Sequence, residues 1–350
     1  MRRLPIYFLI DISESMIGEP IQHVEEGMAN IIKALKSDPY AIETVWVSVL
    51  VFAGQAKTIV PLQEIADFYP PRFPIGGGTS LSKGLGHLMY ELRSNVIKTT
   101  HEQKGDWKPI IFLLTDGVPT DDTRSAIQEW KQNWQKSTNL VAISFGQETD
   151  LSLLTELTEH VLMFNNSSTE QYTAFFKWVT DSIKTSSVSV DNSTSGFELA
   201  KLDDQVISKI DLSKKTMPQE YIDPNYVVLA AKCQNTKRPY LMKYRKVLND
   251  SPFSDLGLQT VAYKLNGAFQ VDNSYYELSD QSVNSFKINS EELIGAPTCP
   301  SCGNQYGLAI CSCGKIHCIG EEEYSTCPWC NTKAQYGTGG GGFDISRTQG

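Results

Sequence analysis

Seven of the eight cysteines in this chain of 350 residues crowd into one short stretch, residues 299–330. They form two C-x-x-C pairs and one C-x-C pair, with a further cysteine and a histidine between them: Cys299, Cys302, Cys311, Cys313, His317, Cys318, Cys327 and Cys330. A C-x-x-C followed by glycine or asparagine is typical of a zinc knuckle, in which two thiolates bind one metal ion. Two knuckles complete a tetrahedral site, and full thiolate ligation leaves no position for a reactive water. The spacing therefore predicts structural zinc.

These ligands can be assigned to zinc ions in more than one way. In the simplest set, the two C-x-x-C pairs share one ion. The other three cysteines then remain for a second ion, with His317 as the candidate fourth ligand. In a cross-braced arrangement, the first pair instead joins His317 and Cys318. We expect one or two zinc ions, and we interpret the isolated Cys233 as a buried strand residue.

A second group of residues has side chains with oxygen atoms, and most of its members follow apolar runs. Its members are Asp11, Ser13 and Ser15 in D-I-S-E-S, Thr79 after three glycines, and Asp116 at the end of I-I-F-L-L-T-D. Carboxylates and hydroxyls are hard donors that suit Mg²⁺ or Mn²⁺, and glycines let the Thr79 loop approach closely. Alternatively, Asp11 and Ser13 only end a strand and cap a helix. Five such residues at strand ends favour a metal site.

Alternating strands and helices must position these oxygen atoms. Apolar patterns predict strands over 4–12, 44–52, 57–61, 110–115, 140–145 and 161–164, and helices over 18–35, 81–97, 123–134, 151–157 and 169–183. The strands over 44–52 and 57–61 form an expected hairpin. This order is typical of an α/β fold with a doubly wound, mostly parallel sheet, where ligands gather at the carboxyl ends of strands.

The second half of the chain reads differently. Residues 185–198 are rich in Ser, Thr and Asn, and strand-like runs follow at 226–231, 239–247, 260–265 and 268–271. Asn266-Gly267 predicts a hairpin turn between the last two runs. We expect an α/β domain over 1–190, a linker over 191–220, a small β-rich zinc-binding domain over 221–336, and a flexible tail over 337–350.

Composition and motifs exclude several functions. The net charge is −9 and no run of basic residues occurs, so nucleic acid is not the expected partner. The apolar run after Arg3 is too short for a signal peptide, and no stretch is long enough to span a membrane. The chain has no phosphate-binding G-x-x-x-x-G-K, no H-E-x-x-H and no G-x-S-x-G. We expect a cytoplasmic, non-enzymatic binding protein with reduced thiols.

The D-x-S-x-S run, the distant threonine and the later T-D-G resemble the metal-ion-dependent adhesion site of von Willebrand factor A domains, a Rossmann-like fold. The resemblance covers residues 1 to about 190. It implies that Ser13, Ser15 and Thr79 bind the metal directly, while Asp11 and Asp116 act directly or through water. A partner's carboxylate then fills the open coordination position. Glu14 stands where glycine is common in the family, and its charge is expected to alter the local field.

Over the whole chain, an A domain followed by a β segment and a module with C-x-C-G and C-P-W-C resembles the TerY family of bacterial tellurite-resistance and stress-response proteins. This resemblance implies an adaptor that works with a protein kinase and a PPM-type phosphatase. Two alternatives stand beside it. A scaffold subunit like those of transcription factor IIH has a similar domain order, and a cross-braced zinc module is also found in RING-type ubiquitin ligases.

Overall fold

The computed structural model describes residues 2–116, 118–145, 151–164, 169–191, 200, 207–209, 224–249, 260–280, 286–337 and 341–348. In the N-terminal part, the strands are β1 (Leu4–Asp11), β2 (Val45–Phe52), β3 (Ala56–Glu64), β4 (Ile110–Thr115), β5 (Asn139–Phe145), β6 (Val161–Phe164) and β7 (Ile207–Lys209). The helices are α1 (Glu19–Lys36), α2 (Pro39–Thr44), α3 (Leu81–Asn95), α4 (Arg124–Asn133), α5 (Leu151–Leu157) and α6 (Thr169–Asp191), with short 3-10 turns η1 (Glu14–Met16) and η2 (Ile65–Asp67).

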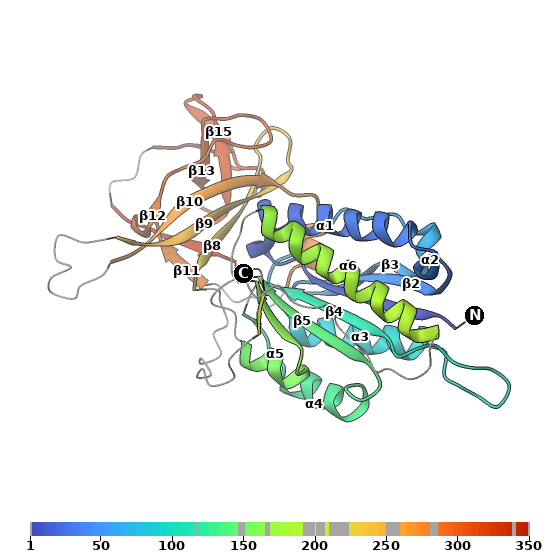
Figure 1. Cartoon of the computed structure of the whole chain (residues 1–350). Coiled ribbons are helices and arrows are strands. Elements are labelled where there is room, and N and C mark those ends of the chain that lie inside the picture. The colour runs from blue at the N-terminus through green and yellow to red at the C-terminus, as the bar shows by residue number, and fades with distance from the viewer. Residues whose placement is uncertain are drawn as a thin grey trace.

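These strands form one sheet in the order β3-β2-β1-β4-β5-β6-β7. The five inner strands run parallel, while β3 and β7 pair antiparallel at the two edges. Helices cover both faces (Figure 1), which explains why every residue of β1 is buried. Ile6, Phe8 and Ile10 belong to one core, and Tyr7 and Leu9 belong to the other. The predicted α/β class with a mostly parallel sheet is confirmed.

The C-terminal part is rich in short strands. They are β8 (Tyr226–Lys232), β9 (Pro239–Asn249), β10 (Thr260–Gln270), β11 (Phe286–Asn289), β12 (Leu293–Ile294), β13 (Tyr306–Ile310), β14 (Ile316–Ile319), β15 (Tyr324–Thr326), β16 (Lys333–Gln335) and β17 (Asp344–Arg347). A short helix α7 (Ser274–Leu278) follows β10, and a 3-10 turn η4 (Ser290–Glu292) follows β11. The main sheet has the order β12-β10-β9-β8-β14-β13, and two small sheets pair β11 with β17 and β15 with β16.

Three expectations about this half need correction. Asn266-Gly267 forms no hairpin turn, because β10 runs through it with a register irregularity opposite β9. An Asn-Gly pair suits an irregular strand as well as a turn, and the long partner strand decides between the two. The expected linker contributes β7 to the first sheet, and α6 extends to Asp191, into its Ser/Thr-rich start. The rest of that linker lies outside the described residues, apart from residue 200.

The expected tail is partly structured. Its residues 344–347 form β17, which pairs antiparallel with β11, and Ile345 is buried in the core of the C-terminal sheet. The Arg347 guanidinium also donates to the Tyr226 carbonyl at 2.5 Å. Residues 344–347 are therefore packed in the C-terminal domain, although a glycine run precedes them.

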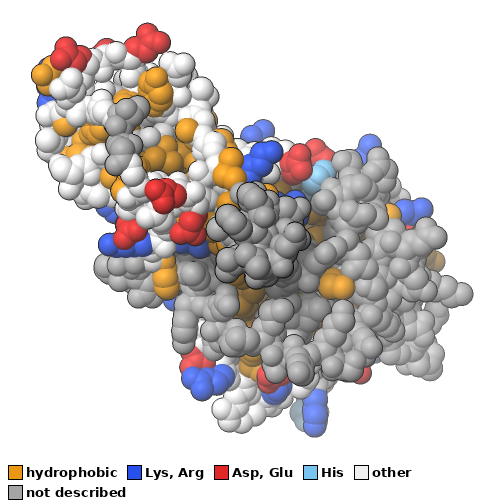
Figure 2. Space-filling model, turned by 90° about the vertical axis from the view of Figure 1, so that its left-hand side faces the viewer, with side chains coloured by type: hydrophobic (Ala, Val, Ile, Leu, Met, Phe, Trp, Pro, Cys, Tyr) orange, Lys and Arg blue, Asp and Glu red, His pale blue; other side chains and the backbone are white. Residues whose placement is uncertain are grey.

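The two halves share one apolar core. Val228, Leu241, Tyr275 and Leu278 of the C-terminal part are buried in the same cluster as the inner face of β1 and helix α1. The C-terminal part lies at one end of the α/β sheet (Figure 1). In the space-filling view it forms the upper lobe, which shows hydrophobic side chains over its middle, acidic side chains at its top, and both acidic and basic ones along its lower edge (Figure 2). The two parts are thus packed against each other by apolar burial.

Candidate functional site

The oxygen-bearing residues lie at the ends of β1 and β4 and in the loop that leads into α3. Asp11 is the last residue of β1, and Asp116 follows β4, the parallel neighbour of β1. Ser13 and Ser15 lie in the turn that leaves β1, and Thr79 lies just before α3. Because the carboxyl ends of parallel strands meet at one edge of a sheet, the fold brings these distant segments together.

A chain of hydrogen bonds joins four of the five predicted residues. Asp11 Oδ1 accepts from the Ser13 amide at 2.9 Å, and Asp11 Oδ2 accepts from the Thr115 hydroxyl at 2.6 Å. Ser13 Oγ lies 2.9 Å from Ser15 Oγ, which donates to Asp116 Oδ1 at 2.8 Å. Asp11, Ser13 and Ser15 are buried, whereas Asp116 is partly exposed.

The Thr79 loop is held beside this chain by its backbone. The Thr79 amide donates to Thr120 Oγ1 at 2.9 Å, and the Thr120 amide donates back to the Thr79 carbonyl at 2.9 Å. The Gly78 amide donates to Glu14 Oε2 at 3.3 Å, which ties the loop to the turn that carries Ser13 and Ser15. The sequence pattern did not predict these contacts of Thr120 or Thr115. Thr115 could have been identified as a candidate, since it is the threonine of T-D-G.

The donor set fits a hard divalent cation. Two carboxylates and three hydroxyls are oxygen ligands of the kind that Mg²⁺ and Mn²⁺ bind, and no cysteine or histidine is among them. Asp11 is already oriented by two donors, so its carboxylate needs little rearrangement to act directly or through water. The arrangement can therefore hold a hard divalent cation.

Glu14 does not face this group as a free charge. It is fully buried, and its Oε1 accepts a hydrogen bond of 2.5 Å from the hydroxyl of Tyr275 in α7. Burial raises the pKa of Tyr275 well above its usual value, and the neighbouring Glu14 charge adds to this rise. The hydroxyl therefore remains a donor. The residue that departs from the family pattern thus contacts the C-terminal domain.

The cysteines form two groups of four. In the first cluster, Cys233, Cys299, Cys302 and Cys318 place their sulfur atoms within 4.8 Å of one another. The Sγ–Sγ distances include 3.7 Å from Cys302 to Cys318 and 3.9 Å from Cys318 to Cys233. Three of the four cysteines are packed in the core of the C-terminal sheet. The first cluster is therefore an interior feature of this domain.

The second cluster lies nearer the surface. It groups Cys311, Cys313, Cys327 and Cys330, again within 4.8 Å, with Sγ–Sγ distances of 3.6 Å from Cys311 to Cys330 and 3.9 Å from Cys313 to Cys327. Cys313 and Cys330 are exposed. Four sulfurs around zinc at about 2.3 Å stand roughly 3.8 Å apart along each tetrahedral edge. Both clusters fit that spacing.

This grouping corrects the expected pairing. The two C-x-x-C pairs, which formed the simplest expected set, belong to different clusters. The clusters interleave along the chain, and the first pair joins Cys318, as in the cross-braced alternative. His317 is in neither cluster: its Nδ1 donates to the Cys318 carbonyl at 2.9 Å, and its Nε2 accepts from Tyr336 at 2.7 Å.

Cys233 takes the place expected for His317, and the backbone explains how. The Cys233 amide donates to the Arg238 carbonyl at 2.8 Å, and the Lys237 amide donates to the Cys233 carbonyl at 3.0 Å. The turn starting at Cys299 has the same two bonds, 2.8 and 2.9 Å long. Lys237 also has φ of +60°, matching the positive φ of Gly303. Cys233 therefore begins a knuckle in which Thr236 replaces the second cysteine, so the C-x-x-C signal is absent from the sequence.

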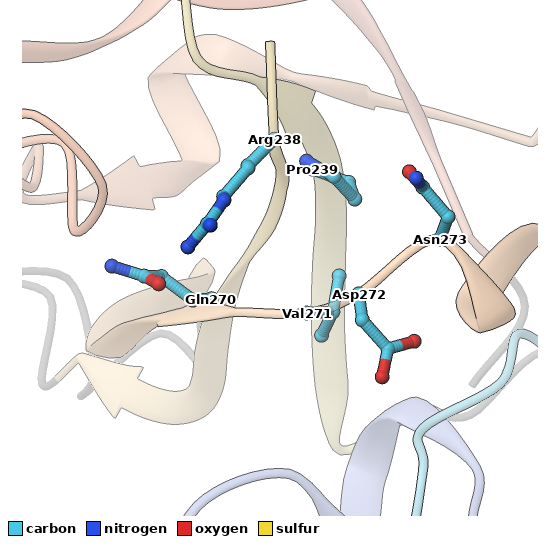
Figure 3. A pocket seen from close by; sticks show the side chains of 6 residues that line it. All are labelled: Arg238, Pro239, Gln270, Val271, Asp272 and Asn273. Carbon is cyan, nitrogen blue, oxygen red and sulfur yellow. The ribbon is translucent and has the colours of Figure 1, made fainter. Parts of the chain in front are cut away.

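A shallow pocket of about 510 Å³ lies beside the first cluster. Its lining combines the end of the Cys233 knuckle with the segment that leads from β10 to α7: Arg238, Pro239, Gln270, Val271, Asp272 and Asn273 (Figure 3). Gln270 Nε2 donates to the Pro300 carbonyl at 2.5 Å, between Cys299 and Cys302. The pocket thus marks the place where the α7 segment is fixed to the first cluster.

Comparison with known families gives two matches. The sequence model of the von Willebrand factor type A domain matches residues 6–178, and that of the TerY-C metal binding domain matches residues 223–350. Among the described residues, no helix has the length and apolar character needed to cross a membrane.

Individual relatives match less than half of the chain. Inter-alpha-trypsin inhibitor heavy chain H1 of Mesocricetus auratus is 28% identical over 159 residues, and that of Bos taurus is 26% identical over 160 residues. Each match covers 43% of this chain but only 17% of the relative.

Two solved structures match about half of the chain. Proximal thread matrix protein 1 from the mussel byssus has 20% identity, covers 53% of this chain and 46% of its own, and has a TM-score of 0.38. A von Willebrand factor type A protein from Catenulispora acidiphila has 16% identity, covers 52% and 42%, and also has a TM-score of 0.38.

Proposed function

Because this chain combines a von Willebrand factor type A domain with a TerY-C metal binding domain, we propose that it is a non-enzymatic adaptor that binds protein partners through a divalent cation. The observation that carries the proposal is the hydrogen-bonded chain from Asp11 through Ser13 and Ser15 to Asp116. In the proposal, the two serines and Thr79 bind Mg²⁺ or Mn²⁺, and the aspartates act directly or through water. An acidic side chain of the partner fills the open position.

The C-terminal domain in this proposal holds two structural zinc ions, one in each four-cysteine cluster. The Sγ–Sγ distances of 3.6–3.9 Å support tetrahedral thiolate sites. Four thiolates leave no position for a bound water, so these ions stabilise structure rather than catalyse a reaction. Reduced cysteines of this kind agree with a cytoplasmic protein.

The TerY-C match supports a more specific role. We propose that the chain acts in a bacterial tellurite-resistance or stress-response system, where it links a protein kinase to a PPM-type phosphatase. Neither nucleic acid nor membrane is part of this proposal.

The interleaved order of the clusters favours one other candidate, a RING-type ubiquitin ligase, because it is the cross-braced order. Against it, Cys233 comes from the turn between β8 and β9, whose sheet packs on the α/β domain. An in vitro ubiquitination assay separates the two candidates. We expect no ubiquitin conjugates, and conjugates dependent on Cys318 would support the ligase.

The main test is a pull-down with purified kinase and phosphatase, using the wild type and Asp11→Ala in the presence of Mg²⁺. Asp67→Ala is the matched control, because Asp67 is exposed and lies after β3, which runs antiparallel and ends at the opposite edge of the sheet. We expect the wild type and Asp67→Ala to retain the partners when Mg²⁺ is present. Equal retention by Asp11→Ala would reject the cation as the link.

A further inference from the structure

Helix α7 and the two residues after it lie directly against the loops of the adhesion site. The Gly77 amide donates to Ser279 Oγ at 2.8 Å, and the Asp280 amide donates to the Gly77 carbonyl at 2.9 Å. On the neighbouring β2–β3 turn, the Gln55 amide donates to the Leu278 carbonyl at 2.9 Å. These bonds fix the C-terminal domain to the loop that leads into Thr79.

Two glycines make this close approach feasible. A Cβ added at Gly54 would lie 1.9 Å from the Asp280 nitrogen, and one added at Gly76 would lie 2.8 Å from Leu278 Cβ. Both distances are shorter than van der Waals contact, so no other residue fits without moving α7. The glycine-rich loop thus accommodates the C-terminal domain as well as the turn of Ser13 and Ser15.

Glu14 is the contact that reaches the metal-binding turn itself. It lies between Ser13 and Ser15, and its two carboxylate oxygens accept from Tyr275 and from the Gly78 amide. One buried side chain therefore joins the serine turn, the glycine loop and α7. Moving α7 would remove the Tyr275 hydrogen bond from a buried carboxylate, which is costly.

A second contact holds the same turn from β9. Lys243 is 3% exposed, and its Nζ donates to the Ser15 carbonyl and, at 3.4 Å, to the Ile17 carbonyl. Its charge also lies 4.4 Å from the centre of the Tyr226 ring. A lysine is buried only where it is well paired, so the backbone of Ser15 has a fixed position relative to the C-terminal sheet.

The α7 segment is also fixed to both cysteine clusters. Gln270, just before it, donates to Pro300 between Cys299 and Cys302. The Tyr276 ring meets the Trp329 ring edge-to-face, with centroids 6.3 Å apart and planes at 86°. Trp329 lies between Cys327 and Cys330, and its Nε1 donates to the Ile316 carbonyl at 2.8 Å. Tyr275 therefore contacts Glu14, which lies between Ser13 and Ser15, while its neighbour Tyr276 contacts Trp329, which lies between Cys327 and Cys330.

We propose that α7 is a built-in part of the adhesion site, in which Glu14 and Tyr275 are positioning residues and Tyr276 couples the site to the second cysteine cluster. The proposal rests on cation binding at Asp11, Ser13 and Ser15. Since α7 contacts Glu14 of the serine turn and Trp329 of the second cluster, ordering the helix at either contact lowers the cost of ordering it at the other. Cation binding and docking of α7 then strengthen each other.

The test measures Mn²⁺ affinity by titration calorimetry on the full zinc-loaded chain. The variants are Tyr275→Phe, Tyr276→Ala and the matched control Tyr324→Ala, since Tyr324 is an exposed tyrosine of the same domain. Measured zinc content establishes that both clusters remain filled. We expect Tyr275→Phe and Tyr276→Ala to weaken Mn²⁺ binding about fivefold or more, the lower end of ordinary coupling between sites. The control should not change it.

Hydrogen exchange gives a second readout that a purely structural role would not produce. We expect Mn²⁺ to slow exchange at the amides of residues 274–280 in the wild type but not in Tyr275→Phe. If the wild type binds Mn²⁺ while both tyrosine variants bind it equally well and exchange in α7 does not respond, the coupling is wrong. If the wild type itself binds no Mn²⁺, the proposed function fails instead.

Discussion

The oxygen site and the cysteine clusters are assembled in opposite ways. The oxygen site stands on β1 and β4, which are central, parallel and buried along their full length. The second cysteine cluster lies between two turns. Cys311 and Cys313 come from the turn between β13 and β14 at the edge of the six-stranded sheet, whereas Cys327 and Cys330 come from the turn between β15 and β16, strands of three residues each that form a two-stranded sheet. In the first case a large core positions the ligands. In the second, half of the ligands come from a two-stranded sheet that is too short to be stable by itself.

This difference indicates what a metal ion does at each place. In the proposed function, the cation at the oxygen site would bind to a scaffold that folds without it. Zinc in the clusters would instead stabilise turns that have little core of their own, as in small domains that need a metal to fold. The first cluster lies between these extremes, since its cysteines are packed among apolar residues of the six-stranded sheet.

The largest effect is expected from removing zinc. A zinc-selective chelator should make residues 286–337 sensitive to protease, because apparent binding energies of structural zinc are about 10–16 kcal/mol in small domains. Segments of the α/β domain such as 4–95 should stay resistant, as should the chain after removal of Mg²⁺. Limited proteolysis with mass spectrometry checks this. Equal loss of resistance in both domains would contradict the contrast drawn above.

The next effect concerns the membership of the first cluster. Cys233→Ser should reduce bound zinc from two ions to one per chain, because three thiolates hold the ion poorly. His317→Gln should retain both ions, since that ring bonds to Cys318 O and Tyr336 rather than to a cluster. Elemental analysis of purified protein gives the counts. If only the histidine variant loses zinc, His317 is a zinc ligand and Cys233 is not.

A smaller effect is expected from filling the contact between the two domains at Gly54. Gly54→Ala should lower the unfolding free energy by about 1–3 kcal/mol, since its methyl group would overlap the backbone at Asp280. Gly86→Ala is the matched control: Gly86 lies within α3, and an added Cβ would meet nothing within 4 Å. That change should stabilise the chain by about 1 kcal/mol, through helix propensity. Urea unfolding measures the unfolding free energy of both variants. If Gly86→Ala destabilises the chain as much as Gly54→Ala does, the contact at Gly54 has no special role.

Much of the α/β domain was predictable because its signals are local and repeated. Strand Ile110–Thr115 and helix Leu151–Leu157 have the predicted bounds, and α1 buries the apolar positions expected of it. Four of the five oxygen-bearing residues were equally easy to propose from the sequence, since Asp11, Ser13, Ser15 and Asp116 follow apolar runs. Alternation of buried strands and amphipathic helices leaves few other folds.

The interface and the ligand pairing were not predictable because they depend on distant partners. Cys233 lacks the second cysteine of a knuckle, and only the backbone turn shared with Cys299 identifies it. Glu14 appeared as an unusual charge in a known motif, whereas its partner Tyr275 lies in the other domain. Asn266-Gly267 was misjudged because the length of β9 opposite it cannot be read locally.

The most direct test of the account is Mn²⁺ binding to the zinc-loaded chain, measured by calorimetry for the wild type and Asp11→Ala. The account predicts one Mn²⁺ per wild-type chain and none in Asp11→Ala, with two zinc ions and an intact fold in both proteins. Equal Mn²⁺ binding by the two proteins, or none by the wild type, would contradict it.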